Sequence, residues 1–217
     1  MNILEVYKKY EQLPNQAEHQ INVAAVARVI LGHMSLELDK ENIIIACLLH
    51  DLGNIAKYNF DPQTLAKMPG LVDPAMVPHW EKVKKEFIEK YGNGSHNMTM
   101  KMVEELGVSE RVKELVDAVG FSEGVNNAAS DDFGKKICAY SDMRLKPLGL
   151  ASLEDRMADL RVRYSGHPEG EVTREQFENA IREIEQQIFT HCDIKPEDIT
   201  VKELEKVKDQ LKTIQIT

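Results

Sequence analysis

Residues 39–54 read DKENIIIACLLHDLGN, and this stretch decides the fold. Asp39 is a favourable N-cap residue, and the apolar run that follows it is too long and too regular for a half-buried strand. The stretch therefore predicts a buried helix that ends near Gly53. The last turn of this helix places two ionisable residues, His50 and Asp51, on faces that are otherwise apolar.

The segments on both sides also repeat apolar residues at helical spacing, and none alternates as a strand would. We therefore predict an all-α fold. Residues 60–78 contain several prolines and no clean period, which predicts a long loop with one helical turn. The predicted helices cover residues 2–13, 15–36, 40–51, 79–91, 96–106, 109–120, 131–146 and 152–164.

Two further helices are predicted beyond Gly166, Pro168 and Gly170, which mark a boundary. We expect residues 1–165 to form the main domain and residues 166–217 to form a C-terminal helical hairpin. Each of the two helices carries a narrow apolar stripe at spacings of three and four. Two roles fit this hairpin: packing on the main domain, or forming a homodimer contact.

Composition excludes several classes of partner. The 217 residues carry a formal net charge of −9, whereas broad binding to nucleic acid or to an anionic membrane needs a basic surface. Cys47, Cys138 and Cys192 are far apart and odd in number, so they form neither a disulfide framework nor a CxxC motif. The N-terminus is too charged for a signal peptide, and no apolar run could span a bilayer. We therefore expect a cytoplasmic protein with no nucleic-acid or membrane partner.

Ionisable residues on apolar helix faces point to a site, because buried charge is costly unless it is paired or bound to a metal. His19, His50, Asp51 and Asp142 all have such positions, and His96 opens a helix with an apolar inner face. Taken singly, a histidine of this kind is usually a hydrogen-bonded core residue and an aspartate is usually a cap. Asp142 is predicted in mid-helix, where it caps nothing. Together, imidazole and carboxylate groups are common ligands of divalent metals, and a metal can generate hydroxide near neutral pH.

The order H…HD…D on separate helices resembles the HD superfamily of metal-dependent phosphohydrolases. The strings LLHDLGN (48–54) and AYSDMRLKPLGLASLEDR (139–156) strengthen the resemblance, which covers about residues 14–164. It implies an HD-domain helical bundle whose metal ligands are His19, His50, Asp51 and Asp142. It also implies hydrolysis of a phosphate ester, most often of a nucleotide or a related small molecule.

Departures from the family pattern bear on the number of metals. Relatives with two metals have two further histidines; His96 matches the first, but no histidine lies near residues 119–121. We therefore expect one divalent metal (Mn, Fe, Ni, Co or Zn, with Mg also chemically suitable), and a second metal is in doubt. Those relatives also have a lysine directly after HDxG, where this chain has Asn54, with Lys57 one helical turn further on. The motif of the cyclic-dinucleotide branch is missing.

The resemblance suggests a role for each candidate residue. Asp51 ligates the metal and orients the attacking water, while Lys57, Arg144 and Asn54 are expected to contact the substrate, the first two through its phosphate. His96 is a fifth ligand, a general acid at the leaving group, or a helix-start residue bonded to a carboxylate. Two simpler explanations stay open: Lys57 is solvated, and Arg144 pairs with an acidic residue at 154 or 155.

Two other functions fit part of the pattern. Some proteins resembling this fold use two irons to oxidise small molecules, although that chemistry needs more ligands than the sequence offers. A metal-containing HD fold could also serve as a non-catalytic nucleotide sensor or scaffold. The sequence specifies neither the substrate nor the metal.

Overall fold

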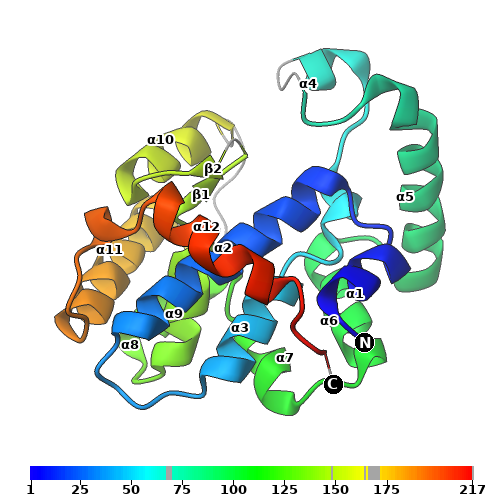
Figure 1. Cartoon of the computed structure of the whole chain (residues 1–217). Helices are drawn as coiled ribbons and strands as arrows, with labels where there is room; N and C mark the ends of the chain where they lie inside the picture. The colour runs from blue at the N-terminus through cyan, green and yellow to red at the C-terminus, as the bar shows by residue number, and fades with distance from the viewer. Residues whose placement is uncertain (67–69, 148, 164, 166–171, 217) are drawn as a thin grey trace.

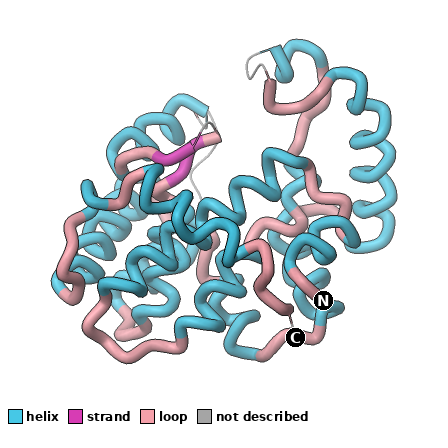
Figure 2. The backbone as a smooth tube through the Cα atoms, in the orientation of Figure 1, coloured by secondary structure: helices cyan, strands magenta, loops and turns pink. Residues whose placement is uncertain are grey.

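The chain is helical along most of the length that the computed structural model describes, namely residues 1–66, 70–147, 149–163, 165 and 172–216. The fold is all-α, as the sequence predicts, and one very small antiparallel sheet interrupts the helices (Figures 1 and 2). In chain order the elements are α1 (Ile3–Lys9), α2 (Pro14–His33), α3 (Lys40–Leu49), η1 (Asn54–Lys57), α4 (Pro62–Ala66), η2 (Pro74–Met76), α5 (Val77–Tyr91), α6 (Ser95–Leu106), α7 (Glu110–Asp117), η3 (Phe121–Glu123), α8 (Gly124–Ala129), α9 (Phe133–Asp142), β1 (Leu145–Lys146), β2 (Gly149–Leu150), α10 (Leu153–Arg163), α11 (Arg174–Thr190), η4 (Pro196–Asp198) and α12 (Val201–Leu211).

The core is centred on α2 and α3. Helix α2 packs against α3, α9 and α12, and α3 also packs against α7 and α9. Because α3 has neighbours on several sides, every residue from Ile43 to Leu49 is buried, which explains the uninterrupted apolar run. Burying each of its larger side chains contributes roughly 1.5–3 kcal/mol relative to exposure in water. The core therefore holds the C-terminal end of α3, and with it His50, in a fixed position.

Helix α9 is shorter than predicted and ends at Asp142. The chain then reverses in the β1–β2 hairpin, where Leu145 pairs with Leu150. The expectation of a helix reaching residue 146 was wrong, and so was the placement of Asp142 in mid-helix. Pro147 accounts for part of this, because it disfavours the helical conformation at Lys146 and has no N–H to bond the carbonyl of Met143. Asp142 consequently lies at a helix end, where the backbone turns away from the core.

The C-terminal helices carry the predicted apolar stripes, and each packs mainly on helices of the main domain. Helix α12 lies along α2, whereas α11 packs on α8 and α9 (Figure 1). The stripe residues Ile181, Ile184 and Leu204 are buried in these contacts. The end of the chain then returns to the N-terminus, where the backbone amide of Ile3 donates to the carbonyl of Ile214 at 3.0 Å. Much of the stripes that suggested a dimer contact is thus covered within the chain, although Val201 is 60% exposed. Most of the predicted boundary falls on 166–171, outside the described residues.

Residues 60–78 contain α4 and η2, slightly more helix than predicted, and residues 67–69 are outside the described part. Figure 1 shows α4 and α5 standing apart from α10, on the other side of the N-terminal half of α2. Trp80 is buried at the start of α5, with its ring 4.6 Å from that of His79. Among the described helices, none has the length and hydropathy needed to cross a membrane.

Candidate metal centre

Three helices bring the four predicted ligands together. His19 lies on α2, His50 is the C-cap of α3 with Asp51 directly after it, and Asp142 ends α9. His19 Nε2 is 3.0 Å from Asp142 Oδ1 and 3.9 Å from Asp51 Oδ2. His50 Nε2 is 3.6 Å from Asp142 Oδ1 and 3.7 Å from Asp51 Oδ2. Two imidazoles and two carboxylates therefore converge on one point.

The hydrogen bonding of His50 leaves one ring nitrogen free to bind a metal. Nδ1 lies 2.8 Å from the carbonyl oxygen of Cys47, which can only accept, so Nδ1 carries the proton of the neutral ring. Nε2 is buried and has no hydrogen-bond partner among the described residues. Its two carboxylate neighbours lie beyond hydrogen-bonding distance. Once Nε2 has lost its proton, an imidazole held in this way aims a lone pair at the carboxylates, which fits a metal ligand. In the absence of a metal, the nearby carboxylates favour the protonated ring, and a bound cation would replace that proton.

The electrostatics of the cluster favour a cation. Burial opposes a charged His50 ring, but the carboxylates of Asp51 and Asp142 outweigh it and raise the pKa of His50 to about 9. Burial likewise opposes the charge on Asp142, yet hydrogen bonding and attraction from His19 and His50 hold the pKa of Asp142 well below its usual value. The protein thus keeps its carboxylate charge at this point, and a divalent cation would neutralise it.

Amide side chains that we did not single out from the sequence hold Asp51 in place. Gln16 Nε2 and Asn54 Nδ2 each donate to Asp51 Oδ2 at 2.9 Å. The backbone amide of Asp51 donates to Gln20 Oε1 at 3.2 Å. A sequence signal did exist, because Gln16, His19 and Gln20 are spaced by three and four and so share one face of α2. Such contacts behind a ligand fix its orientation.

Gly53 is required by the close approach of α6. Its backbone amide donates to Thr99 Oγ1 at 2.9 Å. A Cβ atom at Gly53 would lie 2.5 Å from the backbone carbonyl oxygen of Ser95 and 2.5 Å from the backbone nitrogen of Thr99. Only glycine fits, and the tight contact fixes the turn that follows Asp51.

His96 does not join the cluster. Its Nε2 is 2.8 Å from Asp117 Oδ1, and its side chain is 52% exposed. In the described part of the chain, the residues whose ligand atoms lie within 4.8 Å of one another as a group are His19, His50 and Asp51. The structure therefore favours the simplest of the three alternatives for His96, a residue near a helix start bonded to a carboxylate, over a fifth ligand.

Arg144 is also placed differently from the prediction. It is buried, and Nε donates to the carbonyl of Ala151 at 2.9 Å. Nη1 donates to the hydroxyl of Tyr140 at 2.9 Å and to the carbonyl of Pro196 at 3.1 Å. These contacts tie α9 to the segments that follow it. The described contacts of Arg144 all lie within the fold, so its expected contact with a phosphate stays a prediction. The acids named in the alternative bond elsewhere, because Glu154 pairs with Arg182 and Asp155 accepts from Ser152.

The two remaining substrate-side candidates lie just after the HD pair. Asn54 begins η1 and contacts Asp51 directly, while its own Oδ1 is buried without a hydrogen-bond partner among the described residues. Lys57 ends η1 one turn later, and its side chain is exposed. An exposed ammonium at this position is available to an anionic ligand.

Comparison with protein-family models identifies the class. The HD-domain model matches residues 17–149, which include all four clustered residues, and the chain belongs to this family. The HD superfamily consists largely of metal-dependent phosphohydrolases. No curated protein and no solved structure matches the chain significantly.

Proposed function

We propose that this protein is a phosphohydrolase that uses one divalent metal to cleave a phosphate ester of a nucleotide or a related small molecule. The observation that carries the proposal is the orphaned Nε2 of His50, which is buried and faces two carboxylates. His19, His50, Asp51 and Asp142 would hold the metal. Their mixed nitrogen and oxygen set suits Mn, Fe, Co, Ni or Zn, and one such group in the described residues supports one ion.

The bound cation would supply a Lewis acid for a phosphoryl oxygen and a source of hydroxide near neutral pH. The chain's own residues would do the rest. Gln16 and Asn54 both donate to Oδ2 of Asp51, which leaves Oδ1 as the oxygen to orient the attacking water and accept its proton. Lys57 would attract the anionic substrate as a point charge on the rim.

A matched pair of histidine variants on α2 tests the proposal. His19→Ala removes one of the clustered imidazoles. His33→Ala removes an exposed imidazole that pairs with Asp193 at the far end of the same helix, about 21 Å along the axis. Both variants would be compared with the wild type by elemental analysis and by phosphate release from nucleotides and phosphomonoesters with each candidate metal.

We expect His19→Ala to lose metal and phosphate release, and His33→Ala to keep both. A His19→Ala protein that hydrolyses phosphate esters at the wild-type rate would refute the proposal. So would a wild-type protein that binds metal but releases phosphate from none of the substrates with any of the metals.

A further inference from the structure

A line of hydrogen bonds continues behind the amides that hold Asp51, and it leads to a tyrosine. The amide oxygen of Gln16, Oε1, accepts from Asn54 Nδ2 at 3.2 Å and from the hydroxyl of Tyr58 at 3.4 Å. The same side chain donates from Nε2 to Asp51 Oδ2 at 2.9 Å. Gln16 therefore connects the hydroxyl of Tyr58 to the carboxylate of a candidate metal ligand.

The direction of these hydrogen bonds is set by the first donor in the line. Asn15 Nδ2 donates to the Tyr58 hydroxyl at 2.6 Å. A hydroxyl has a single proton, so one that accepts from Asn15 is left to donate to the amide oxygen of Gln16. If the Gln16 amide turned over, its oxygen would face the Asp51 carboxylate and its N–H groups would face other donors. The line thus keeps the N–H of Gln16 directed at Asp51.

The hydroxyl of Tyr58 keeps the proton that this arrangement needs. Burial raises the pKa of Tyr58, the hydrogen bond from Asn15 lowers it, and the negative charge of Asp51 raises it again. The net shift of the pKa is upward. The hydroxyl therefore stays a donor at neutral pH.

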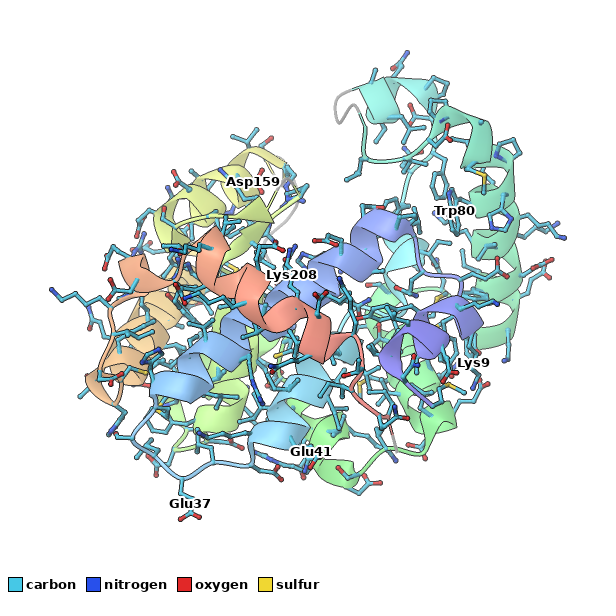
Figure 3. All side chains as sticks on the ribbon, viewed as in Figure 1. Lys9, Glu37, Glu41, Trp80, Asp159 and Lys208 are labelled. Atoms are coloured by element: carbon cyan, nitrogen blue, oxygen red, sulfur yellow. The ribbon has the colours of Figure 1, made fainter. Side chains whose placement is uncertain are left out.

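Contacts with α5 hold Tyr58 in place. Tyr58 is the C-cap of η1, and its backbone carbonyl accepts from Lys84 Nζ at 2.7 Å. Its ring stacks on that of Phe60, with the centroids 5.8 Å apart. Lys84 lies one turn after Trp80, which Figure 3 shows on the side of α5 that faces the N-terminal end of α2. Contacts with both α2 and α5 therefore set the position of the hydroxyl.

We propose that Tyr58 is a positioning residue, which orients the carboxylate of Asp51 through Gln16 and so raises the affinity of the centre for its metal. The inference rests on the proposed function, in which Asp51 is a metal ligand. A carboxylate that is already held in the right orientation loses less conformational freedom when a metal binds. Tyr58 acts on the metal only through the amide of Gln16.

A double-mutant cycle on metal affinity tests this inference in the full-length protein. Its variants are Tyr58→Phe, which deletes only the hydroxyl, Gln16→Ala, and the two combined. Tyr91→Phe is the matched control, because it deletes a hydroxyl that donates to Glu105 Oε2 at 2.7 Å and not to the cluster. Competition for Mn²⁺ and for Zn²⁺ with a chelator of known affinity gives each dissociation constant. Thermal unfolding of the metal-free proteins gives their stability.

We expect Tyr58→Phe to weaken metal binding about three- to tenfold, the range for one hydrogen bond between uncharged groups. In the Gln16→Ala background the same change should alter the affinity by less than about twofold, because the group that connects Tyr58 to Asp51 is gone. A merely structural role of Tyr58 would instead give losses that add in the double variant. Tyr91→Phe should lower the unfolding temperature by a similar amount and leave the metal affinity within about twofold of the wild type.

Four results would overturn the inference: no binding of either metal by the wild type, unchanged affinity in Tyr58→Phe, additive losses in the double variant, or an equal loss in Tyr91→Phe. Failure of the proposed function looks different. Metal binding that depends on Tyr58 through Gln16, in a protein that releases phosphate from no ester, would refute the hydrolase and retain the positioning role. Ester hydrolysis by Tyr58→Phe with the wild-type metal affinity and kcat/KM would refute the role of Tyr58 and retain the hydrolase.

Discussion

Arg144 is buried and Arg156 is largely buried, and they lie before and after the same hairpin in the chain, yet their hydrogen bonding differs. Arg144 donates to two backbone carbonyls and a tyrosine hydroxyl. Arg156 has one shared carboxylate and a buried Nε without a partner among the described residues. The fold thus supplies acceptors for the guanidinium of Arg144 and leaves one buried donor of Arg156 without an acceptor among the described residues. Burial alone does not separate the two; the count of satisfied donors does.

The histidines show the same contrast. His33 and His96 are exposed, and each has an aspartate oxygen 2.8 Å from a ring nitrogen. The ring of His50 is buried, with one nitrogen bonded and the other open. The open nitrogen of His50 thus has a buried counterpart in Nε of Arg156, whereas the exposed histidines each have a carboxylate partner.

The largest effect should come from His50. His50→Ala removes the open nitrogen, so we expect metal binding and phosphate release to fall to background. His96→Ala should keep its metal, because Asp117 rather than the cluster is its partner. Elemental analysis of both purified variants checks this. If His96→Ala lost metal to the same extent, a histidine with a carboxylate partner would be no different from one with an unpaired ring nitrogen, which contradicts the comparison.

The next effect should be on stability at Arg144. Arg144→Met leaves buried carbonyls and the Tyr140 hydroxyl without their donor, and we expect a loss of about 3 kcal/mol in the free energy of unfolding. Urea unfolding measures it. Arg156→Met should cost far less or be neutral, since the charge it removes is already poorly compensated. Equal losses in the two variants would contradict the contrast.

A smaller effect should follow from loosening Asp51. Gln16→Ala deletes one of two amide donors to Oδ2. We expect metal affinity to fall about 10- to 100-fold, the usual range for a residue behind a ligand, with little change in stability. Competition with a chelator of known affinity gives the dissociation constant. Asn22→Ala is the control on the same helix, because Asn22 bonds the exposed Glu18. Unaltered affinity in Gln16→Ala would mean that Asn54 suffices.

The smallest effect should come from Asp132, whose partner Arg111 already has a filled fork. Hydrogen bonding from Arg111 outweighs burial and lowers the pKa of Asp132. Its charged form therefore stabilises the fold above the ordinary aspartate pKa of about 4, and this contribution is lost as the pH falls through the lower folded value. Asp132→Asn keeps a good N-cap, so we expect a loss of at most about 1 kcal/mol at pH 7.

Urea unfolding of the wild type and of Asp132→Asn, measured from pH 7 down to pH 3, tests the sign. The difference between the two proteins should shrink as the solution is acidified, because Asp132 becomes protonated in the wild type. A difference that grows below pH 4 would show that the pair does not act through charge.

Regular patterns made much of the fold predictable. The apolar run of α3 and the stripes of α11 and α12 identified helices that the structure contains. The sequence did not predict which helices pack against each other, because an apolar stripe identifies a buried face but not the helix that covers it. The end of α9 was missed for a local reason: the apolar spacing continued to Leu145, but Leu145 belongs to the β1–β2 hairpin, where it pairs with Leu150.

The residues of the candidate metal site were also predictable in part. His19, His50, Asp51 and Asp142 stood out because charge on an apolar face is rare, and the structure brings them together. Gln16 was overlooked because an amide on a helix has many ordinary explanations. Arg144 was assigned to the substrate on its residue type alone. Residue type does not show whether a guanidinium already donates its hydrogen bonds within the fold. Whether those donors already have acceptors is visible only in the three-dimensional structure.

The central claim is that this cluster holds one divalent metal through the open nitrogen of His50. Elemental analysis of the wild type and of His50→Ala, each purified and then reconstituted with the candidate metals, tests it most directly. We predict close to one metal ion per wild-type chain and none above background in the variant. Two ions per wild-type chain, no ion, or an ion retained by His50→Ala would contradict the account.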